Sequence, residues 1–406
     1  MTTRILVIGA GFSGMWSALG AVRLLEKEGR DDVEVALVAP EASLHVRPRL
    51  YEKFPEGLKA PLQNLFNTTG IRFIPGLVEN IDVENNVVKI KLVGDTGDVY
   101  PLQYDRLVLA AGSHLFCPPI PGLKEHASNI DQIAAAVHLE SHLKSLAAKP
   151  ASSARNSVVV AGAGFTGLEI AAELPSRLRE ILGQDTDAQV ILVDRNSEVG
   201  AGLGEGPRPV IIEALTELGV SWKMGAGVAE VSEQGVRLEN GEFISTDTVI
   251  WTAGARASLL TAQIPAERDN FGRLHVDCNL KVKGLNNIFA TGDCAMAATD
   301  DEGNYAMMSC QHANFLGRSA GHNVAADLLG VKPVPYSQPK YVTYLALGPW
   351  GAVYSEGWER EVKLTGAVAG DLKKQINTVW IYPPKGSRKE ILVAVDPGQQ
   401  IPDVVV

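Results

Sequence analysis

One string of residues occurs twice in this chain, and it constrains the fold more than any other feature. Residues Arg4–Gly14 read RILVIGAGFSG, and residues Ser157–Gly167 read SVVVAGAGFTG. Each copy is an apolar run that ends in a GxGxxG turn. Helical patterns and further apolar strands follow the turns at Met15–Glu28, Val33–Val38, Leu168–Leu182 and Gln189–Val193. Strand, glycine turn, helix and strand in this order predict a dinucleotide-binding unit, and the chain contains two of them.

Each glycine of such a turn has its own physical reason. The first permits a tight turn, the second lets the backbone approach a pyrophosphate, and the third lets the helix pack closely on the strand. The phosphates would then lie on unpaired N–H groups at the positive end of the helix dipole. The cofactor-binding glycines predicted in this way are Gly9, Gly11 and Gly14 in the first turn, and Gly162, Gly164 and Gly167 in the second.

The residue that ends the second strand distinguishes the two units. In the second copy, VILVDRN places Asp194 where a carboxylate can accept hydrogen bonds from both ribose hydroxyls, which favours NADH. Arg195 beside it could contact a 2′-phosphate, so NADPH stays open as the donor. In the first copy Ala39 occupies the equivalent position, and Glu41, two residues later, is the nearest substitute.

Three later segments indicate a flavoprotein. They read YDRLVLAAGS at Tyr104–Ser113, TVIWTAG at Thr248–Gly254 and NIFATGDCA at Asn287–Ala295. The TGD of the last segment places Asp293 in a loop, where its carboxylate can accept hydrogen bonds from a ribityl chain. Helix capping is the alternative for Asp293 alone, and its place in the ordered set argues against it. Two dinucleotide units in one chain therefore suggest FAD with a nicotinamide donor.

These segments and the two glycine turns resemble the two-dinucleotide-binding flavoproteins of the pyridine nucleotide-disulfide reductase type over nearly the whole chain. The resemblance implies that Asp293 binds the ribityl chain of FAD. It also implies that the other two segments cross between an FAD domain and an NAD domain. Four further cofactor contacts follow from it: Ala111, Gly112, Gly254 and Gly292.

The expected fold is α/β, with two Rossmann-like domains and a small C-terminal α+β domain. Residues 1–116 and 272–333 are predicted to form the FAD-binding domain, with an NAD(P)H-binding domain at 117–271 between them. Residues 334–406 are predicted to form a C-terminal cap.

The C-terminal segment has fewer diagnostic features. Thr365–Val379 shows a helical pattern, whereas Glu390–Val406 is strand-like and then proline-rich. Three tryptophans could line an acceptor pocket or a membrane surface, although core packing is the favoured interpretation: Trp350, Trp358 and Trp380.

The cysteines exclude several kinds of chemistry. Cys117, Cys278, Cys294 and Cys310 are far apart and form no CxxC pair, so the spacing of metal ligands and redox dithiols is missing. Disulfide reductases of the resembled type carry redox cysteines shortly after the first Rossmann unit, but Glu41–Leu62 contains none. We therefore expect electrons to leave FAD directly. Sulfide:quinone oxidoreductases need cysteines on both sides of the flavin, and no cysteine follows Cys310, which makes that branch a minor alternative.

Two segments resemble a particular branch, the type II NADH:quinone oxidoreductases and ferroptosis-suppressor-like reductases. SLHVRPRLY at Ser43–Tyr51 is similar to the segment that runs beside the flavin with a proline, here Pro48. CQHANFLG at Cys310–Gly317 is similar to the helix start near the flavin and quinone, which implies a role for Gln311. Cys310 replaces the usual alanine of this helix start, and leucine replaces a second common glutamine at position 316.

Glu169 is the second candidate catalytic residue. It matches the GxGxxGxE helix of the same branch, whose acid lies close to the nicotinamide and the flavin. On spacing alone, a solvated carboxylate near the helix N-terminus is an equally good interpretation. Glu173, one turn later, is expected on the same helix face.

The charge and hydropathy of the chain limit the kinds of partner that it can bind. The chain has 37 Lys and Arg against 47 Asp and Glu and no basic run, which argues against nucleic acid. No run of about 20 apolar residues is free of charges and proline, so no membrane-spanning segment is expected. With few cysteines, a cytoplasmic location is expected. Peripheral membrane contact and a homodimer both stay open.

The expected enzyme is an FAD-dependent NAD(P)H dehydrogenase that passes electrons to a quinone or a similar small acceptor, with no metal. Two alternatives remain. One is a flavoenzyme of specialised metabolism that reduces or oxidises a small organic substrate. The other is an NADH-sensing flavoprotein that acts by binding a partner, similar to apoptosis-inducing factor.

Overall fold

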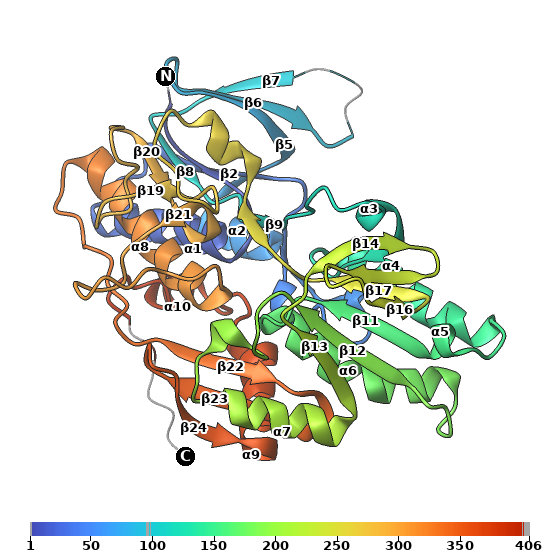
Figure 1. Cartoon of the computed structure of the whole chain (residues 1–406). Helices are drawn as coiled ribbons and strands as arrows, with labels where there is room; N and C mark the ends of the chain where they lie inside the picture. Colours follow the sequence, from blue (N-terminus) through green and yellow to red (C-terminus); the bar gives the residue numbers. More distant parts are fainter. Residues whose placement is uncertain (1, 95–96, 98, 400, 402–406) are drawn as a thin grey trace.

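The computed structural model describes residues 2–94, 97, 99–399 and 401, and its two largest sheets are separate from each other (Figure 1). The first has seven strands in the order β20-β8-β1-β2-β5-β6-β7. Strands β20, β8, β1, β2 and β5 are parallel, and β6 and β7 extend the sheet in antiparallel fashion. Their bounds are β1 Thr3–Ile8, β2 Val33–Ala39, β5 Arg72–Asp82, β6 Val87–Leu92, β7 Val99–Gln103, β8 Arg106–Leu109 and β20 Ile288–Ala290.

The second sheet has five parallel strands in the order β10-β17-β11-β12-β13. Their bounds are β10 Ala127–Ser128, β11 Ser157–Ala161, β12 Gln189–Asp194, β13 Val220–Met224 and β17 Thr248–Trp251. An antiparallel ribbon packs beside it, formed by β14 Val228–Ser232, β15 Gly235–Leu238 and β16 Phe243–Ser245. Each of the two sheets thus contains the strand of one copy of the repeated string, as the sequence predicts.

The helices after the glycine turns begin earlier than the apolar pattern suggested. Helix α1 spans Phe12–Lys27 and α6 spans Phe165–Leu182, so each starts directly after the second glycine of its turn. Helix α8, Cys310–Leu329, packs tightly against α1. A Cβ atom on Gly321 would overlap the backbone of Ser17, so this close packing requires glycine.

Shorter elements connect these parts. The helices are α2 Gln63–Thr69, α3 Leu123–His126, α4 Ile133–Ser145, α5 Ser153–Asn156 and α7 Arg208–Leu218. The strands are β3 Ser43–His45, β4 Lys59–Pro61, β9 Ser113–Leu115, β18 Ala255–Ala257, β19 Leu274–His275 and β21 Ala295–Met296. Strands β9 and β18 pair antiparallel, and they are the two crossings between the sheets.

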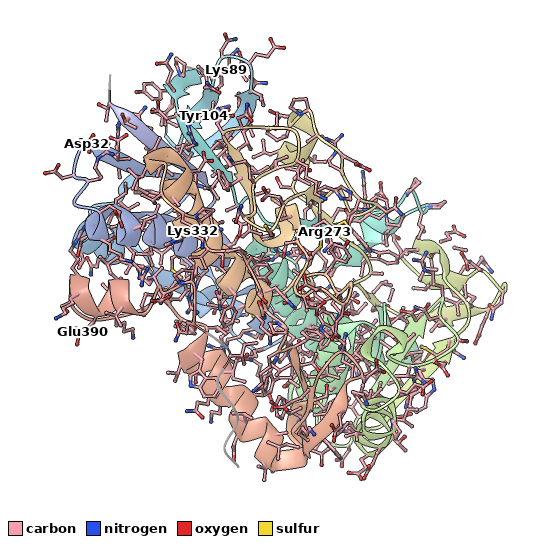
Figure 2. The ribbon with its side chains drawn as sticks, turned by 90° about the vertical axis from the view of Figure 1, so that its left-hand side faces the viewer. Asp32, Lys89, Tyr104, Arg273, Lys332 and Glu390 are labelled. Carbon is pink, nitrogen blue, oxygen red and sulfur yellow. The ribbon has the colours of Figure 1, made fainter. Side chains whose placement is uncertain are left out.

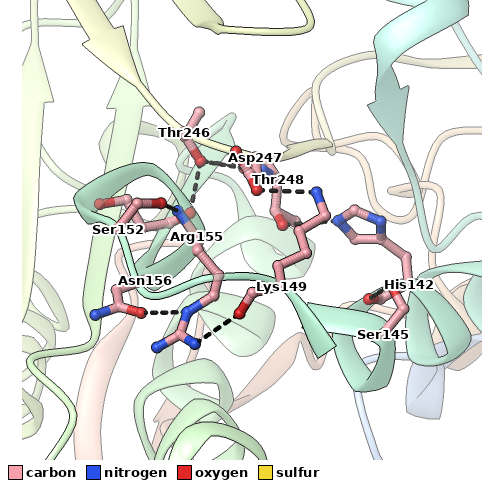
Figure 3. A network of polar contacts seen from close by, with 10 residues as sticks. His142, Ser145, Lys149, Ser152, Arg155, Asn156, Thr246, Asp247 and Thr248 are labelled. Carbon is pink, nitrogen blue, oxygen red and sulfur yellow. Dashed lines mark hydrogen bonds and ion pairs between the residues drawn. The ribbon is translucent and has the colours of Figure 1, made fainter. Parts of the chain in front are cut away.

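A polar network holds the start of β17 in the second sheet (Figure 3). His142 of α4 is hydrogen-bonded to the hydroxyl of Thr248 at 2.8 Å, and the ammonium group of Lys149 lies 2.9 Å from the Asp247 carboxylate. Burial lowers the pKa of His142, so its ring is neutral at pH 7. The start of β17, which leads to the crossing β18, is therefore held by neighbouring helices.

The C-terminal part is a three-stranded antiparallel sheet with one helix. Its strands are β22 Val342–Ala346, β23 Ala352–Glu356 and β24 Glu361–Thr365. Helix α9, Gly366–Gln375, continues into the π-helical turn η8, Ile376–Trp380, close to the predicted helix Thr365–Val379. Trp350 packs on the second domain's core, Trp358 stacks on Tyr341, and Trp380 is 44% exposed.

The strand-like interpretation of Glu390–Val406 is wrong in its first part. Residues Arg388–Val393 form helix α10, which starts with a capping box between Ser387 and Glu390. Ile391 and Leu392 are buried in the core of the first domain, and α10 packs beside α1. Figure 2 labels Glu390 of this helix. The proline-rich end lies largely outside the described residues.

Core packing does not follow the predicted domain boundaries closely. Ile264 belongs to the first domain's core, so the chain re-enters that domain before residue 272. Leu345 and Leu347 of the cap belong to the second domain's core. These contacts do not decide where each domain ends, so the predicted domain boundaries stay a prediction. In the described part of the chain, no helix is long and apolar enough to cross a bilayer.

Candidate active site

A cavity of about 530 Å³ lies between the two domains. Its walls include the first glycine turn, the residues after β2, the crossing β9, and the starts of α6 and α8. Cofactor pockets are commonly about 300–1,000 Å³, so this cavity is of the size that holds a large part of a dinucleotide. Among the predicted site residues, its walls contain Gly9, Gly11, Glu41, Pro48, Ala111, Gly112, Glu169 and Asp293.

The first glycine turn fits a pyrophosphate. Gly9 has φ +110°, a conformation that side chains disfavour, and a Cβ on Gly14 would overlap the carbonyl oxygen of Gly9. Gly11 is the N-cap of α1, where no side chain caps the helix and no acid occupies the first turn. A Cβ on Gly11 would meet nothing within 4 Å, so this face is open. Uncapped N–H groups beside an open face are what an anionic phosphate requires.

The second turn repeats this geometry but lies outside the cavity wall. Gly162 has φ +115°, and a Cβ on Gly167 would overlap its carbonyl oxygen. Gly164 is the N-cap of α6, again without a capping side chain or an acid in the first turn. The Asp194 carboxylate accepts a hydrogen bond from the N–H of Ala163 at 2.6 Å. Asp194 thus lies directly against the turn, at the end of β12.

The Asp293 carboxylate is held by polar neighbours in the cavity wall. Ser113 Oγ donates a hydrogen bond to Asp293 at 2.6 Å, and Arg47 contacts both the Oγ and the carbonyl of Ser113. Arg47 also forms an ion pair with Asp131, which follows β10 of the second domain. Burial raises the pKa of Asp293, while Ser113 and Arg47 act in the opposite direction. Arg47 was not singled out from the sequence.

Three further predicted cofactor residues differ in whether they line the cavity: Glu41 does, and Gly292 and Gly254 do not. Glu41 is hydrogen-bonded to His45 and forms an ion pair with Lys59, and the hydrogen bond with His45 lowers the pKa of Glu41, which keeps it ionised. Gly292 lies beside Ser13, with no room for a Cβ. Gly254 has φ +90° in the crossing between the sheets and accepts a hydrogen bond from the Phe116 N–H at 2.6 Å. Gly292 and Gly254 are outside the cavity wall.

Glu169 is buried in the cavity wall and is paired with a residue from the cap. Its carboxylate lies 3.0 Å from Lys373 Nζ and accepts a hydrogen bond from the Ala346 N–H at 3.2 Å. Lys373 also donates to the carbonyl of Tyr344 at 3.0 Å. Burial raises the pKa of Glu169, and Lys373 limits the rise. No sequence motif marks Lys373, because its role depends on how α9 docks onto α6.

Tyr51 is a second wall residue that the sequence did not single out. Its hydroxyl accepts a hydrogen bond from Asn377 Nδ2 at 3.2 Å. Burial raises the pKa of Tyr51, and the negative charge of Glu169 adds to the rise, so the phenol is neutral. Glu173 also has a raised pKa because of burial. Of these titratable groups on the α6 side, Glu169 and Tyr51 line the cavity and Glu173 does not.

Gln311 does not line the cavity. Its amide Nε2 donates to the carbonyl of Val342 at 3.0 Å, and its Oε1 accepts from Gln338 at 3.4 Å. Its neighbour Cys310 does line the cavity, and burial raises the pKa of that thiol to about 11. All four cysteines are free thiols. Cys117 lines a separate cavity of about 380 Å³ that shares Trp251 with the first.

The fold and the site define an α/β oxidoreductase with two dinucleotide-type domains around one shared cavity. Residues 3–317 match the family model described as pyridine nucleotide-disulphide oxidoreductase. The chain therefore belongs to this family, which confirms the predicted family, the fold class and the class of enzyme. The predicted FAD and NADH are the cofactor and donor of that enzyme type.

Known proteins of similar sequence and structure include dehydrogenases. An NADH dehydrogenase-like protein of Mycobacterium tuberculosis is 44% identical, over 98% of this chain and 99% of its own. A type II NADH:quinone oxidoreductase of Staphylococcus epidermidis is 28% identical, over 93% of this chain and 95% of its own. The structure of NDH2 from Plasmodium falciparum in complex with NADH superposes with a TM-score of 0.76 at 15% identity, covering 97% and 98% of the two chains, which shows a shared fold.

Proposed function

We propose that this protein transfers electrons from NADH through FAD to a quinone or a similar small acceptor, without a redox-active disulfide. The observation that carries the proposal is the shared cavity, which joins the first glycine turn to the buried Glu169–Lys373 pair. A relative named as a type II NADH:quinone oxidoreductase, aligned over nearly the full length, supports the same acceptor class.

The residues of the first domain would hold FAD. The uncapped N-terminus of α1 at Gly11 would bind its pyrophosphate, and the Asp293 carboxylate would accept hydrogen bonds from its ribityl hydroxyls. Glu41, ionised and at the cavity wall, would accept from the adenosine ribose. When bound, FAD accepts a hydride from the nicotinamide and passes electrons on, while the protein supplies positions and charges.

The second domain would hold the donor. The N-terminus of α6 at Gly164 is uncapped, as a pyrophosphate site requires, and Asp194 lies beside it at the end of β12. A carboxylate there accepts hydrogen bonds from two ribose hydroxyls and repels a 2′-phosphate. We therefore propose NADH over NADPH, with Arg195 as the residue that opposes this preference.

Thiol chemistry is disfavoured at the cavity. Cys310 is the cysteine in its wall, and it has no disulfide partner. A thiol with a pKa of about 11 contains little thiolate at neutral pH, so it is a poor nucleophile. The acceptor would then take its electrons from the flavin directly.

Glu169, Lys373 and Tyr51 would handle the protons. Reduction of a quinone to a quinol consumes two protons, and a buried carboxyl with a raised pKa holds its proton more readily than an exposed one. The ammonium group of Lys373 lies 3.0 Å from that carboxyl group. Its positive charge stabilises the carboxylate that forms when Glu169 gives up its proton. Gln311 would act less directly, because its amide is bonded to Val342 of the cap.

We further propose peripheral contact with a membrane through the C-terminal segment. Val379 and Trp380 of η8 and Val393 of α10 are 61%, 44% and 67% exposed. Lysines follow or precede them at positions 374, 385 and 389, which suits a surface with anionic lipids. Sedimentation with and without lipid vesicles tests this proposal. A homodimer stays a prediction, and light scattering tests it.

Stopped-flow spectroscopy tests the central proposal. The purified holoprotein is mixed with NADH or NADPH under anaerobic conditions, and bleaching of the flavin is followed. The reduced protein is then mixed with a soluble quinone, with oxygen or with a one-electron dye. We expect fast reduction by NADH and reoxidation by quinone that is much faster than by oxygen. Equal reoxidation by all three acceptors would instead favour a different acceptor class.

A further inference from the structure

The cap carries a buried arginine that has no counter-ion. Arg360 lies in the turn between β23 and β24 and is only 7% exposed. Its Nη1 is buried without a hydrogen-bond partner, and it forms no ion pair with any residue that the structure describes. Its own backbone is left-handed, with φ +57°, a conformation that non-glycine residues rarely adopt. A buried unpaired charge and a strained backbone at one residue call for a functional explanation.

Aromatic rings hold the guanidinium in place. Arg360 Cζ lies 4.8 Å from the ring centroid of Tyr341 and 6.0 Å from that of Phe165. Tyr341 stacks in turn on Trp358, with centroids 4.4 Å apart. Stacking on the rings orients the guanidinium but offsets only part of the free energy lost when the charge leaves water. A counter-ion for Arg360 is therefore still to be identified.

The rings around Arg360 carry no negative charge. Burial raises the pKa of Tyr341, so its hydroxyl stays a neutral phenol. Burial lowers the pKa of His312 to about 4, so this ring is neutral as well. His312 Nε2 and Trp358 Nε1 are themselves buried without partners in the described structure. The surroundings of Arg360 thus contain unused hydrogen-bonding groups and no carboxylate bonded to it.

The position of Arg360 identifies the anion. Phe165, beneath the guanidinium, is the first residue of α6, directly after the N-cap Gly164. The side chain of Arg360 lies against Gly204 in the loop that follows β12, and its backbone carbonyl lies against Gly206, where there is no room for a side chain. The cap therefore places one cation between the uncapped end of α6 and the loop beyond Asp194.

We propose that Arg360 binds the pyrophosphate of the nicotinamide dinucleotide, so that the cap completes the donor site of the second domain. The inference rests on the proposed use of NADH. A guanidinium can contact two phosphate oxygens at once, and it would complement the N–H groups of the second glycine turn. Arg360 is then a binding residue of the donor site, supplied by a part of the chain about 200 positions away.

The test compares a ligand that carries the pyrophosphate with one that lacks phosphate. The dissociation constant of ADP-ribose is measured by calorimetry for the wild-type holoprotein, Arg360→Met and Arg360→Lys. We expect Arg360→Met to weaken ADP-ribose by about 10- to 100-fold, the worth of a hydrogen-bonded charge. Arg360→Lys keeps the charge but loses the planar fork, so it should lose less. The reduced riboside of nicotinamide has no phosphate. The riboside concentration that gives half-maximal flavin reduction should therefore differ by no more than about twofold between Arg360→Met and the wild type.

Arg318→Met is the matched control. Arg318 is also a largely buried arginine that stacks on aromatic rings, 4.2 Å from the centroid of Trp16 and 5.1 Å from that of Phe315, but it lies between α8 and α1. Its loss should leave ADP-ribose binding unchanged. An unchanged dissociation constant in Arg360→Met would overturn the proposal, as would equal weakening of ADP-ribose and the riboside. Failure of NADH to bleach the wild-type flavin would refute the proposed function separately, because ADP-ribose binding requires no hydride transfer.

Discussion

The Glu169–Lys373 pair gives the sharpest prediction for stability. The side chains are only 9% and 12% exposed, so their interaction is little screened by solvent. Lys373→Met removes the cation and keeps a side chain of similar length. The Glu169 carboxylate then stays buried with the Ala346 N–H as its remaining partner. Breaking a buried pair in this way costs about 3–5 kcal/mol.

The loss should depend on pH with a definite sign. Burial already raises the folded-state pKa of Glu169 above its ordinary value of 4.5, and Lys373 limits that rise. Without Lys373 the pKa rises further, so the folded state of the variant binds its proton up to a higher pH. Where the folded state binds more protons than the unfolded state, stability falls as pH rises. The extra destabilisation relative to the wild type therefore begins above the raised folded-state pKa of Glu169 and grows as the pH rises further.

Urea unfolding of the holoprotein at pH 5.5 and pH 8 measures this effect. We expect Lys373→Met to lose about 3 kcal/mol at pH 8 and clearly less at pH 5.5. Lys374→Met, the exposed neighbour on the same helix, is the control and should change stability by less than about 0.5 kcal/mol. Adding Glu169→Gln to Lys373→Met should restore part of the loss, because no buried charge remains. Equal losses at both pH values would refute the electrostatic reasoning.

Three further outcomes follow from the site. Asp293→Ala should weaken FAD binding by about 10- to 100-fold, because hydrogen bonds to a charged acceptor are lost. Reconstitution of the apoprotein with FAD measures this affinity. An unchanged affinity would exclude the contact between Asp293 and the ribityl chain. Asp194→Ala should shift the ratio of flavin reduction by NADH and NADPH toward NADPH, and a constant ratio would show that Arg195 or another residue sets the preference. Gln311→Ala should slow reoxidation by quinone while reduction by NADH stays nearly intact, whereas Glu169→Gln should mainly disturb the NADH side or quinone protonation. Wild-type behaviour of both variants in stopped flow would remove these two residues from the mechanism.

The sequence predicts what depends on local geometry. Gly9 and Gly162 have positive φ and their helices lack caps, and the GxGxxG string encodes both properties within a few residues. The strand order of a Rossmann unit follows from the same string. Asp293 was predictable because its loop directly follows β20 and faces the glycine turn across the parallel strands.

Long-range docking accounts for what the sequence did not predict. Lys373 reaches Glu169 only because the cap packs on α6, and no local pattern records that contact. The position of Gln311 at the start of α8 was predictable, but the direction of its amide depends on Val342. Helix α10 is a different case, because Ser387 and Glu390 form an S-x-x-E capping box that was visible in the sequence.

The return of α10 to the first domain has a mechanical consequence. Ile391 and Leu392 bury their side chains in that domain's core, and Arg388 pairs with Glu26 of α1. The cap is therefore tethered at both ends, through the chain that leads into β22 and through α10. Any rotation of the cap that moves Lys373 away from Glu169 must strain this tether or release α10 from α1. Movement of the cap away from Glu169 and undocking of α10 from α1 are thus coupled, so α10 restrains the cap.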